Sequence, residues 1–514
     1  MSGETANLAL SSSQHMSPRT PLARLVLAAL LTASCATVAS AQSPTAEVAA
    51  PAAAPLTLAD CVQRALTRNF DAEIGRFDTA NAAATVDIAR ASFDPVLRAS
   101  STRSGYRTEG ATRATSGWNN RLGASQHLAT GTDVTVSTGL NRTKNRLSNP
   151  YNPAYDSDVA LTITQPLLKG FGTAANRAAL EQARLGVDRA GYFYRGTMMD
   201  IVRDTEIAYY ELHFTRRQLA VRRVSLEAAQ RLLDENRVKR DKGVLTDLEV
   251  LTADVGVATQ QRNVLLAEQQ LHNAEDALRA LIGQFELDAP LGETAFTGAV
   301  DAAPTVDDTF GRAKAAQPEI LALQANIEQL RIELAKVHRN RLPQLDLTST
   351  LGYDAQRRTA SDALDDLPGS DGYNWQVGLE IVYPLGSRGE RARLIQATND
   401  LSRARLQLRQ LEQDVLVRAR SSVRAVDTNR EAVRVATLAS ELSERQYELE
   451  KERFDVGMST ARRVLDAQAD LDDARVALVS SQVDLLTAFA NLRRLEGRSL
   501  EIYPGAEQIT QAGK

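Results

Sequence analysis

Two short stretches decide the fold, Lys242-Gly243-Val244-Leu245-Thr246 and Val456-Gly457-Met458-Ser459-Thr460. Each glycine ends a segment whose pattern is helical without interruption, from residue 173 to 242 and from 387 to 456. Because an α-helix rises about 1.5 Å per residue, each segment predicts a rod on the order of 100 Å. A second helical pattern follows each glycine, so each stretch predicts the turn of an antiparallel helical hairpin.

The two hairpins belong to an internal duplication. Arg64-Ala65 through Asp71 aligns with Arg312-Ala313 through Glu319, and both copies close on a glycine, Gly283 and Gly497. The predicted organisation is a first repeat at 58–289 with its hairpin at 173–283, and a second repeat at 308–497 with its hairpin at 387–497. Each copy therefore follows one plan: helix, β insert, very long helix, glycine break, helix.

Apolar residues recur every seven positions after each glycine break. They are Val250, Val257, Val264, Leu271 and Leu278 in one copy, and Val464, Leu471, Leu478, Leu485 and Leu492 in the other. Small residues such as Ala253, Ala267 and Ala467 form the second seam. Such heptads predict closely paired coiled-coil helices. On heptads alone, an extended cytoskeletal coiled coil is the favoured interpretation.

The β inserts, at 96–166 and 344–384, are bounded by prolines: Pro95, Pro166, Pro343 and Pro384. Within them the helical period gives way to alternation, as in Val134 and Val136 or Val377 and Leu379. Polar clusters at 115–120, 148–158 and 365–372 predict turns. Both tryptophans, Trp118 and Trp375, fall in the inserts. Aromatic residues on alternating strands are typical of outer-membrane barrels, and a soluble hairpin cap is the alternative.

Closure constrains how such strands could span a membrane. Each insert predicts at least one long hairpin, so one chain supplies about four strands. Four strands cannot close, and open edges are not tolerated in lipid, so several chains would have to share one barrel. Three chains would give about twelve strands. The first insert has an extra hairpin, Leu122–Leu128 and Asp133–Leu140 around Thr130-Gly131. It either adds barrel strands or forms a rim structure.

The composition excludes several other classes of protein. Hydrophobic residues make up 43% and charged residues 24% of the chain, and the mean hydropathy is −0.28, which excludes a bundle of transmembrane helices. The net charge of −4 leaves no basic footprint for nucleic acid. The histidines are scattered without metal-ligand spacing, and no catalytic motif is complete. We therefore expect no enzyme, no cofactor and no metal site.

The N-terminus predicts an export signal at 1–41. Arg24 precedes an apolar run, and Ala39-Ser40-Ala41 provides a cleavage site. Met16 is an alternative translation start, and lipidation of Cys35 is an alternative to cleavage after Ala41. The remaining segments are an Ala/Pro-rich linker at 42–57, an inter-repeat linker at 290–307 and a C-terminal tail at 498–514.

These residues resemble the TolC family of outer-membrane factors. The resemblance rests on the paired proline-bounded inserts, on Gln165-Pro166-Leu167-Leu168 with its echo Tyr383-Pro384-Leu385, and on Phe454-Asp455-Val456-Gly457 followed by Val464-Leu465-Asp466-Ala467. It implies a mostly α fold with β inserts, in which a duplicated helix–β-hairpin–long helix–helix plan forms a trimeric α-helical barrel. That helical barrel is joined to a shared outer-membrane β-barrel.

The resemblance also implies a function and partners. The chain would be a homotrimeric exit duct of a tripartite efflux pump, embedded in outer-membrane lipid, with its helical tunnel in the periplasm. It would pass small molecules outward and dock on a periplasmic adaptor, and through it on an inner-membrane pump. The outer-membrane channel of a type I protein secretion system is one alternative. A periplasmic coiled-coil adaptor or structural protein without a pore is an alternative from another class.

Family members constrict the periplasmic end through contacts at the hairpin tips. An acidic residue six positions after the first glycine is implied, and here it is Glu249. Where relatives have tyrosine and arginine around the second glycine, this chain has Phe454 and Ser459. We therefore expect a displaced gate, in which Arg462 or Arg463 pairs with Asp247 or Glu249. The alternative is a solvated charged face, where such pairs contribute about 0–1 kcal/mol.

The turns themselves predict the adaptor contact. Their candidate residues are Gly243, Thr246, Gly457 and Thr460. Capping of the preceding helix is the simpler role for both glycines.

Overall fold

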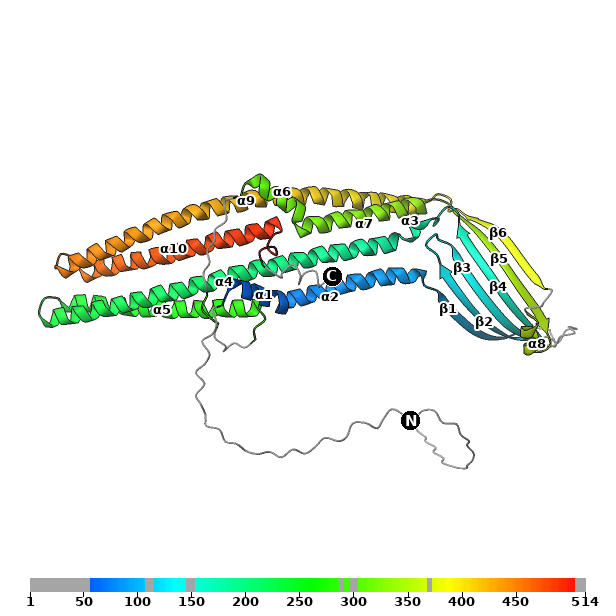
Figure 1. Cartoon of the computed structure of the whole chain (residues 1–514), viewed down its shortest axis with the longest axis horizontal. Helices are drawn as coiled ribbons and strands as arrows, with labels where there is room; N and C mark the ends of the chain where they lie inside the picture. Colours follow the sequence, from blue (N-terminus) through cyan, green and yellow to red (C-terminus); the bar gives the residue numbers. More distant parts are fainter. Residues whose placement is uncertain are drawn as a thin grey trace, which may run out of the picture. The chain divides into compact units, whose positions relative to one another are not determined.

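The first repeat alternates helices and strands in the order that its sequence predicts (Figure 1). The structure, a computed structural model, describes residues 56–106, 115–144, 153–285, 291–294, 304–367 and 372–503. The elements of the first repeat are α1 (Leu58–Arg68), α2 (Phe70–Arg90), the short 3-10 helix η1 (Ala91–Phe93), β1 (Val96–Tyr106), β2 (Thr115–His127), β3 (Asp133–Lys144), β4 (Ala154–Pro166), α3 (Thr173–Asn176), α4 (Ala178–Asp241) and α5 (Asp247–Leu281).

The second repeat follows the same plan with a shorter insert. Its elements are α6 (Val306–Ala316), α7 (Pro318–Asn340), β5 (Gln344–Arg357), α8 (Ala360–Asp365), β6 (Tyr373–Val382), α9 (Arg388–Asp455) and α10 (Ala461–Glu496). The predicted mostly α fold with β inserts is confirmed. The export signal at 1–41, with Met16 and Cys35, lies outside the described residues, as do most of the linkers at 42–57 and 290–307 and the tail from residue 504.

Matching side chains begin the short helices of the two repeats. The side chain of Thr57 accepts a hydrogen bond from the backbone N–H of Asp60, and Thr305 accepts one from Asp308 at the start of α6. Each threonine thereby satisfies a donor that the first helical turn leaves unpaired. Pro318 occupies the first turn of α7, where its missing N–H costs nothing. The duplication is thus visible in the capping chemistry as well as in the element order.

The long helices pack as two hairpins, α4 with α5 and α9 with α10, and α10 also contacts α4. The largest apolar cluster surrounds the middle of α4, where Met198, Val202 and Leu212 are fully buried. Cys61 of α1 is buried in the same cluster, and this burial raises the pKa of its thiol to about 12. Cys61 therefore acts as a small apolar residue.

The strands form one antiparallel sheet in the order β1-β2-β3-β4-β5-β6 (Figure 1). The expectation of about four strands per chain was wrong, because the described residues contribute six. The polar cluster at 115–120 belongs to β2, and residues 154–158 belong to β4, although both were predicted as turns. Asparagine, serine and glycine are accommodated there because both flanking strands satisfy the backbone, as in Asn119↔Asn141.

The four prolines lie at or next to strand ends. β1 and β5 begin at the residues after Pro95 and Pro343, and Pro166 is the last residue of β4. Pro384 follows the end of β6 by two residues. Proline cannot donate to a strand ladder, which explains its place at strand ends.

Candidate functional site

Both hairpin tips use the same backbone turn. Gly243 and Gly457 adopt positive φ values of 74° and 77°. The N–H of Val244 donates to the Lys239 carbonyl at 2.9 Å, and the N–H of Met458 donates to the Arg453 carbonyl at 2.8 Å. Each glycine N–H adds a second bond to the helix it ends. These are Schellman caps, which satisfy the last carbonyls of α4 and α9 and reverse the chain within a few residues.

The helices that follow the two turns begin with charges of opposite sign. Asp247 and Glu249 lie in the first turn of α5, where negative charge is favoured by the helix dipole. Arg462 and Arg463 lie in the first turn of α10, where positive charge is disfavoured. Both arginines are exposed. The second tip therefore carries a local electrostatic cost that an anionic neighbour would remove.

Within one chain, these charges do not pair across the hairpins. Arg240 Nη1 lies 3.8 Å from Asp247 Oδ1, and Arg462 Nε lies 3.8 Å from Asp466 Oδ2, so each pair stays on its own hairpin. Among the described residues, neither Arg463 nor the carboxylate of Glu249 forms an ion pair. The predicted gate pair thus stays a prediction for contacts between chains.

Phe454 is buried where the two hairpins meet. It packs in an apolar cluster with Leu232 of α4 and with Ala461 and Val464 of α10. Lys239 Nζ lies 4.4 Å from the centroid of the Phe454 ring. The sequence reasoning did not identify Lys239. The available signal was the duplication, because Arg453 also stands four residues before its glycine.

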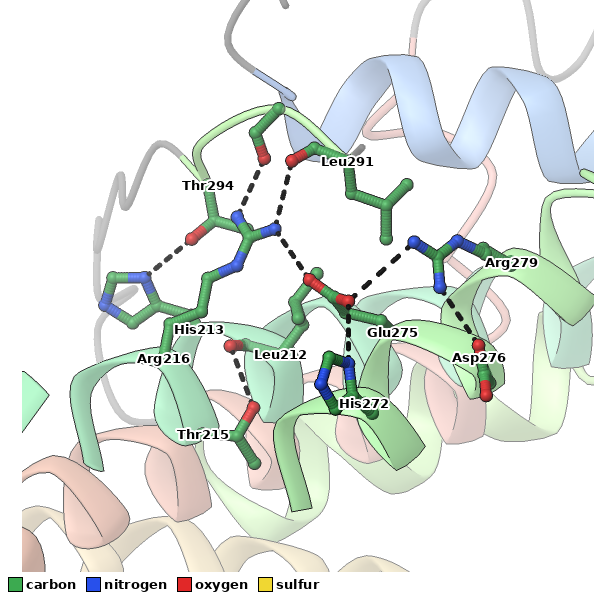
Figure 2. A network of polar contacts seen from close by, with 11 residues as sticks. Leu212, His213, Thr215, Arg216, His272, Glu275, Asp276, Arg279, Leu291 and Thr294 are labelled. Carbon is green, nitrogen blue, oxygen red and sulfur yellow. Dashed lines mark hydrogen bonds and ion pairs between the residues drawn. The ribbon is translucent and has the colours of Figure 1, made fainter. Parts of the chain in front are cut away.

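A belt of polar contacts ties the inter-repeat segment 291–294 to α4 and α5 (Figure 2). Arg216 of α4 donates to the carbonyls of Gly292 at 2.7 Å and Leu291 at 3.2 Å, and its Nη2 lies 3.4 Å from Glu275 Oε1 of α5. His213 Nδ1 lies 3.2 Å from Thr294 Oγ1. Burial lowers the pKa of His213, and the neighbouring Arg217 and Arg216 lower it further.

The C-terminal segment joins the same belt through a buried carboxylate. Glu206 of α4 is 1% exposed, and its Oε1 lies 2.9 Å from Arg493 Nη2 of α10. The hydroxyl of Tyr503 also donates to Glu206 Oε1. Leu56, at the start of the described chain, forms a bridge with Thr294. The beginning of the described chain, its midpoint and its C-terminal segment thus meet around one part of α4.

The sheet has one apolar and one polar face. Strand alternation and register place these exposed residues on one face: Leu97, Trp118, Leu122, Val136, Leu161, Ile163, Leu351, Tyr353, Tyr373, Trp375, Val377, Leu379 and Ile381. The other face is polar. Its charged residues are Arg98, Arg121, Asp133, Asp156, Asp158, Asp346, Asp354 and Glu380. The helix α8 covers Ser157 and Ala355 on the apolar face, and the rest of that face is exposed. An exposed apolar surface of this extent is suited to contact with lipid.

The histidine, cysteine and acidic side chains of the described residues form no group of three or more able to hold a metal ion.

Among the helices of the described segments, none combines the length and the apolar character needed to cross a bilayer.

A sheet with an exposed apolar face, joined to paired helical hairpins of this length, defines a class of outer-membrane transport proteins. The chain belongs to the outer membrane efflux protein family, whose model matches residues 131–284 and 310–498. The two matched segments fall one in each repeat. Members of this family are transport proteins, so the chain is not an enzyme.

Relatives and solved structures agree with this assignment. The outer membrane efflux protein BepC of Brucella suis biovar 1 (strain 1330) is 24% identical over 392 residues, covering 71% of this chain and 80% of the relative. The outer membrane protein TolC of Escherichia coli (strain K12) is 23% identical and covers 72% of this chain and 74% of its own length. The Campylobacter jejuni CmeC outer membrane channel shares the fold, with a TM-score of 0.66 at 17% identity and 89% coverage of both chains.

Proposed function

We propose that the chain is the outer-membrane exit duct of a tripartite efflux pump, and that it works as a homotrimer. In this proposal the sheet lies in the outer membrane and the long hairpins form a tunnel in the periplasm. Small molecules pass from the periplasm to the exterior. The relative from Brucella suis, which is named as an efflux protein, supports efflux as the activity.

The two-faced sheet is the observation that carries the proposal. Trp375 and Leu379 on the edge strand β6 are 68% and 66% exposed, and so they lack a cover within the described chain. An apolar surface of this kind is stable against lipid. The opposite face carries charged and hydroxyl side chains, which are suited to a water-filled lumen. The sheet thus has the polarity of a barrel wall.

The sheet closes only if chains share it. β1 and β6 form its two edges, and an open edge in lipid would leave backbone groups without partners. The described residues form an even number of strands, so β1 and β6 run in opposite directions and β1 of one copy can pair antiparallel with β6 of the next. Three copies would supply eighteen strands, not the twelve that the sequence suggested. Because barrel diameter grows roughly linearly with strand number, the exit would be about one and a half times wider.

The helices provide a second reason for several copies. An apolar row on α9 and its C-cap is exposed in the single chain: Val435, Leu438, Leu442, Leu449 and the C-cap Val456. A similar row on α5 consists of Leu248, Leu251, Val255 and Leu265. The spacing in each row is that of a coiled-coil seam without its partner. In the trimer, each row is covered by a helix of the neighbouring copy.

The tips provide the gate in this proposal. Arg462 or Arg463 of one copy pairs with Asp247 or Glu249 of its neighbour and holds the periplasmic end closed. The position of the arginines in the first turn of α10 supports this pairing, because an anionic partner there offsets the unfavourable interaction with the helix dipole.

The same tips dock the adaptor. Val244 and Met458 occupy equivalent places in the two turns, directly after the glycines, and are 71% and 77% exposed. Together with Thr246 and Thr460, they form two equivalent contact surfaces for a periplasmic partner, each with one exposed apolar side chain. The adaptor would connect the duct to the inner-membrane pump.

Imaging of the detergent-extracted protein by electron microscopy tests the duct. We expect a hollow three-fold particle whose helical tube is on the order of 100 Å long, from the rise of α4 and α9. A density map that resolves strands would count eighteen in the wall. A solid rod or a single-chain particle would exclude the duct, and a hollow trimer with twelve wall strands would exclude only the wider exit.

Export assays then define the cargo. In a host lacking its own duct, expression of the chain with its adaptor and pump should restore resistance to small toxic molecules. Restored secretion of a protein substrate without resistance would instead indicate a type I secretion channel.

A further inference from the structure

The apolar face of the sheet carries charge at one end only. The charged residues that strand alternation places on this face are Arg103, Arg142, Lys144 and Arg357. All four are basic, and the described strand residues place no acidic side chain on this face. The opposite face carries six carboxylates and two arginines. Lumen electrostatics therefore do not explain the basic residues of the apolar face.

Three of these cations stand in one row across the sheet with aromatic residues between them. The cross-strand register runs Arg103↔Trp118, Trp118↔Arg142, Arg142↔Tyr155 and Tyr155↔Arg357. One residue of the row comes from each of five consecutive strands, and direct cross-strand neighbours lie close enough for their side chains to touch. The guanidinium of Arg142 lies 5.6 Å from the centroid of the Tyr155 ring.

The row lies at the end of the strands that is remote from the helices. β1 leaves η1 at Val96 and reaches Arg103 near its end, whereas β4 passes Tyr155 near its start and returns toward α3. In the proposed duct, this end faces the exterior. Arginine with tryptophan and tyrosine at that depth is suited to the boundary between hydrocarbon and headgroups.

Two of the arginines have no anionic partner within the described part of the chain. Among the described residues, no carboxylate pairs with Arg103 or Arg142, and Lys144 lies two residues beyond Arg142 on the same face. Arg357 differs, because its Nε lies 2.5 Å from Asp366 Oδ2. The cations without a described anionic partner therefore lie on β1 and β3, whereas Arg357 on β5 already pairs with Asp366.

We propose that Arg103, Arg142 and Lys144 bind the phosphate groups of a phosphorylated lipid in the outer leaflet, with Trp118 and Tyr155 packed against the lipid below its headgroup. Arginine matches phosphate oxygens in a bidentate manner, and no carboxylate of the described residues competes for the donors of Arg103 and Arg142. The inference rests on the proposed duct, because the duct places this face in lipid.

Trp118 provides a direct readout. The chain contains two tryptophans, so a Trp375→Phe chain reports from Trp118 alone. This protein, purified in detergent, is titrated with bisphosphorylated lipid A, with the same lipid after removal of its phosphates, and with inorganic phosphate. We expect the phosphorylated lipid alone to shift the Trp118 emission and to raise the unfolding temperature. An equal response to inorganic phosphate would show that the row binds a soluble anion, which would overturn the lipid site. An equal response to the dephosphorylated lipid would exclude recognition of phosphate.

Matched variants locate the contact. The triple change Arg103→Gln, Arg142→Gln and Lys144→Gln should weaken lipid binding on the order of a hundredfold, as expected when three cations are removed from an anionic surface. Arg98→Gln removes a charge from the polar face of β1, and Arg357→Gln removes one that is already paired, so both should bind like the parent. Parental affinity in the triple variant, or an equal loss in Arg98→Gln, would overturn the inference.

Electron microscopy of the same samples separates the two proposals. A hollow trimer that ignores the phosphorylated lipid would reject the lipid site and leave the duct intact. Absence of a hollow assembly would reject both.

Discussion

The ammonium of Lys239 lies over the ring of Phe454, so a residue near the end of α4 contacts one near the end of α9. Lys239 Nζ also lies 3.6 Å from Asp455 Oδ1. These contacts join the two hairpins of one chain just before their turns. Motion of one tip is therefore coupled to the other, which bears on any gate built there.

Phe454→Ala should loosen this junction. Removal of a buried phenylalanine costs about 3 kcal/mol or more in the free energy of unfolding. We expect a lower unfolding temperature and faster proteolysis at the tips. Lys239→Met keeps the apolar stem but removes both the cation–π contact and the partly exposed ion pair with Asp455, so its effect should be about 1 kcal/mol. Equal effects of the two changes would contradict the packing role of Phe454.

Gly243→Ala and Gly457→Ala should each destabilise the chain by roughly 1 kcal/mol, because a left-handed backbone disfavours a Cβ atom. No neighbouring atom lies within 4 Å of the added Cβ, so the backbone conformation alone is tested. Gly311→Ala, inside α6 and equally unobstructed, is the control and should stabilise its helix by about 0.5–1 kcal/mol. Thermal unfolding of the three variants measures the contrast, and a uniform sign would refute it.

Arg463→Glu should raise the closed-state conductance of the duct in planar bilayers several-fold, and so should Glu249→Arg, because either change places like charges at the proposed gate. The double exchange restores opposite charges and should return the conductance toward that of the parent. Arg357→Gln, on the apolar face of the sheet, should leave it unchanged. Additive effects in the double variant would show that the two residues do not pair.

Met458→Asp should abolish export in the reconstituted pump, because a carboxylate would have to be desolvated against the adaptor. Met458→Leu retains the apolar area and should keep export near the parental level. Trimer formation, measured by electrophoresis without heating, should be unaffected in both. If Met458→Asp supports full export, the tip does not contact the adaptor through this side chain.

Asp472→Asn should stabilise the protein at neutral pH. Burial in the seam between α10 and α4 raises the pKa of Asp472, and a hydrogen bond with Ser225 only partly offsets this. The folded state therefore favours the protonated acid, and this stabilising contribution is lost as the pH rises through the raised pKa. The variant should exceed the parent in unfolding temperature at pH 7.

The stabilising effect of Asp472→Asn should disappear as the pH falls toward the ordinary pKa of 3.8. Asp473→Asn is the matched control, because the side chain of Asp473 is 73% exposed and forms an ion pair with Arg222 at the protein surface. It should change the unfolding temperature little at any pH. A pH-independent difference for Asp472→Asn would assign its effect to packing.

The sequence alone predicted the repeats, the long helices and the position of both tips. The evidence was local: an unbroken helical period with one glycine, seen twice. The sequence-based prediction was wrong for β2, because Ser116-Gly117-Trp118-Asn119-Asn120 has the composition of a turn. Its strand conformation is stabilised by partners on both sides, such as Ser104↔Gly117 and Gly117↔Thr143. These small and polar residues show no apolar alternation, so the sequence of β2 by itself does not reveal the pairing.

Only some of the residues at the hairpin tips could be predicted, because spacing along the sequence reveals charged positions but not contacts between helices. Asp247, Glu249, Arg462 and Arg463 were found from their distance to a glycine, which is a local measure. The burial of Phe454 against Leu232 depends on two helices from different repeats, and Lys239 became visible only through that contact. The row from Arg103 to Arg357 likewise exists only once the strand register is known.

The hydrogen bond from Tyr503 to Glu206 has a consequence for biogenesis. A chain that stopped before Arg493 would fold α4 with a carboxylate buried and no cation beside it, at a cost of several kcal/mol. The belt around α4 can therefore be completed only after the end of the chain has emerged. Truncated products lack this closing step, so they should be degraded as unfolded chains and not incorporated into mixed assemblies.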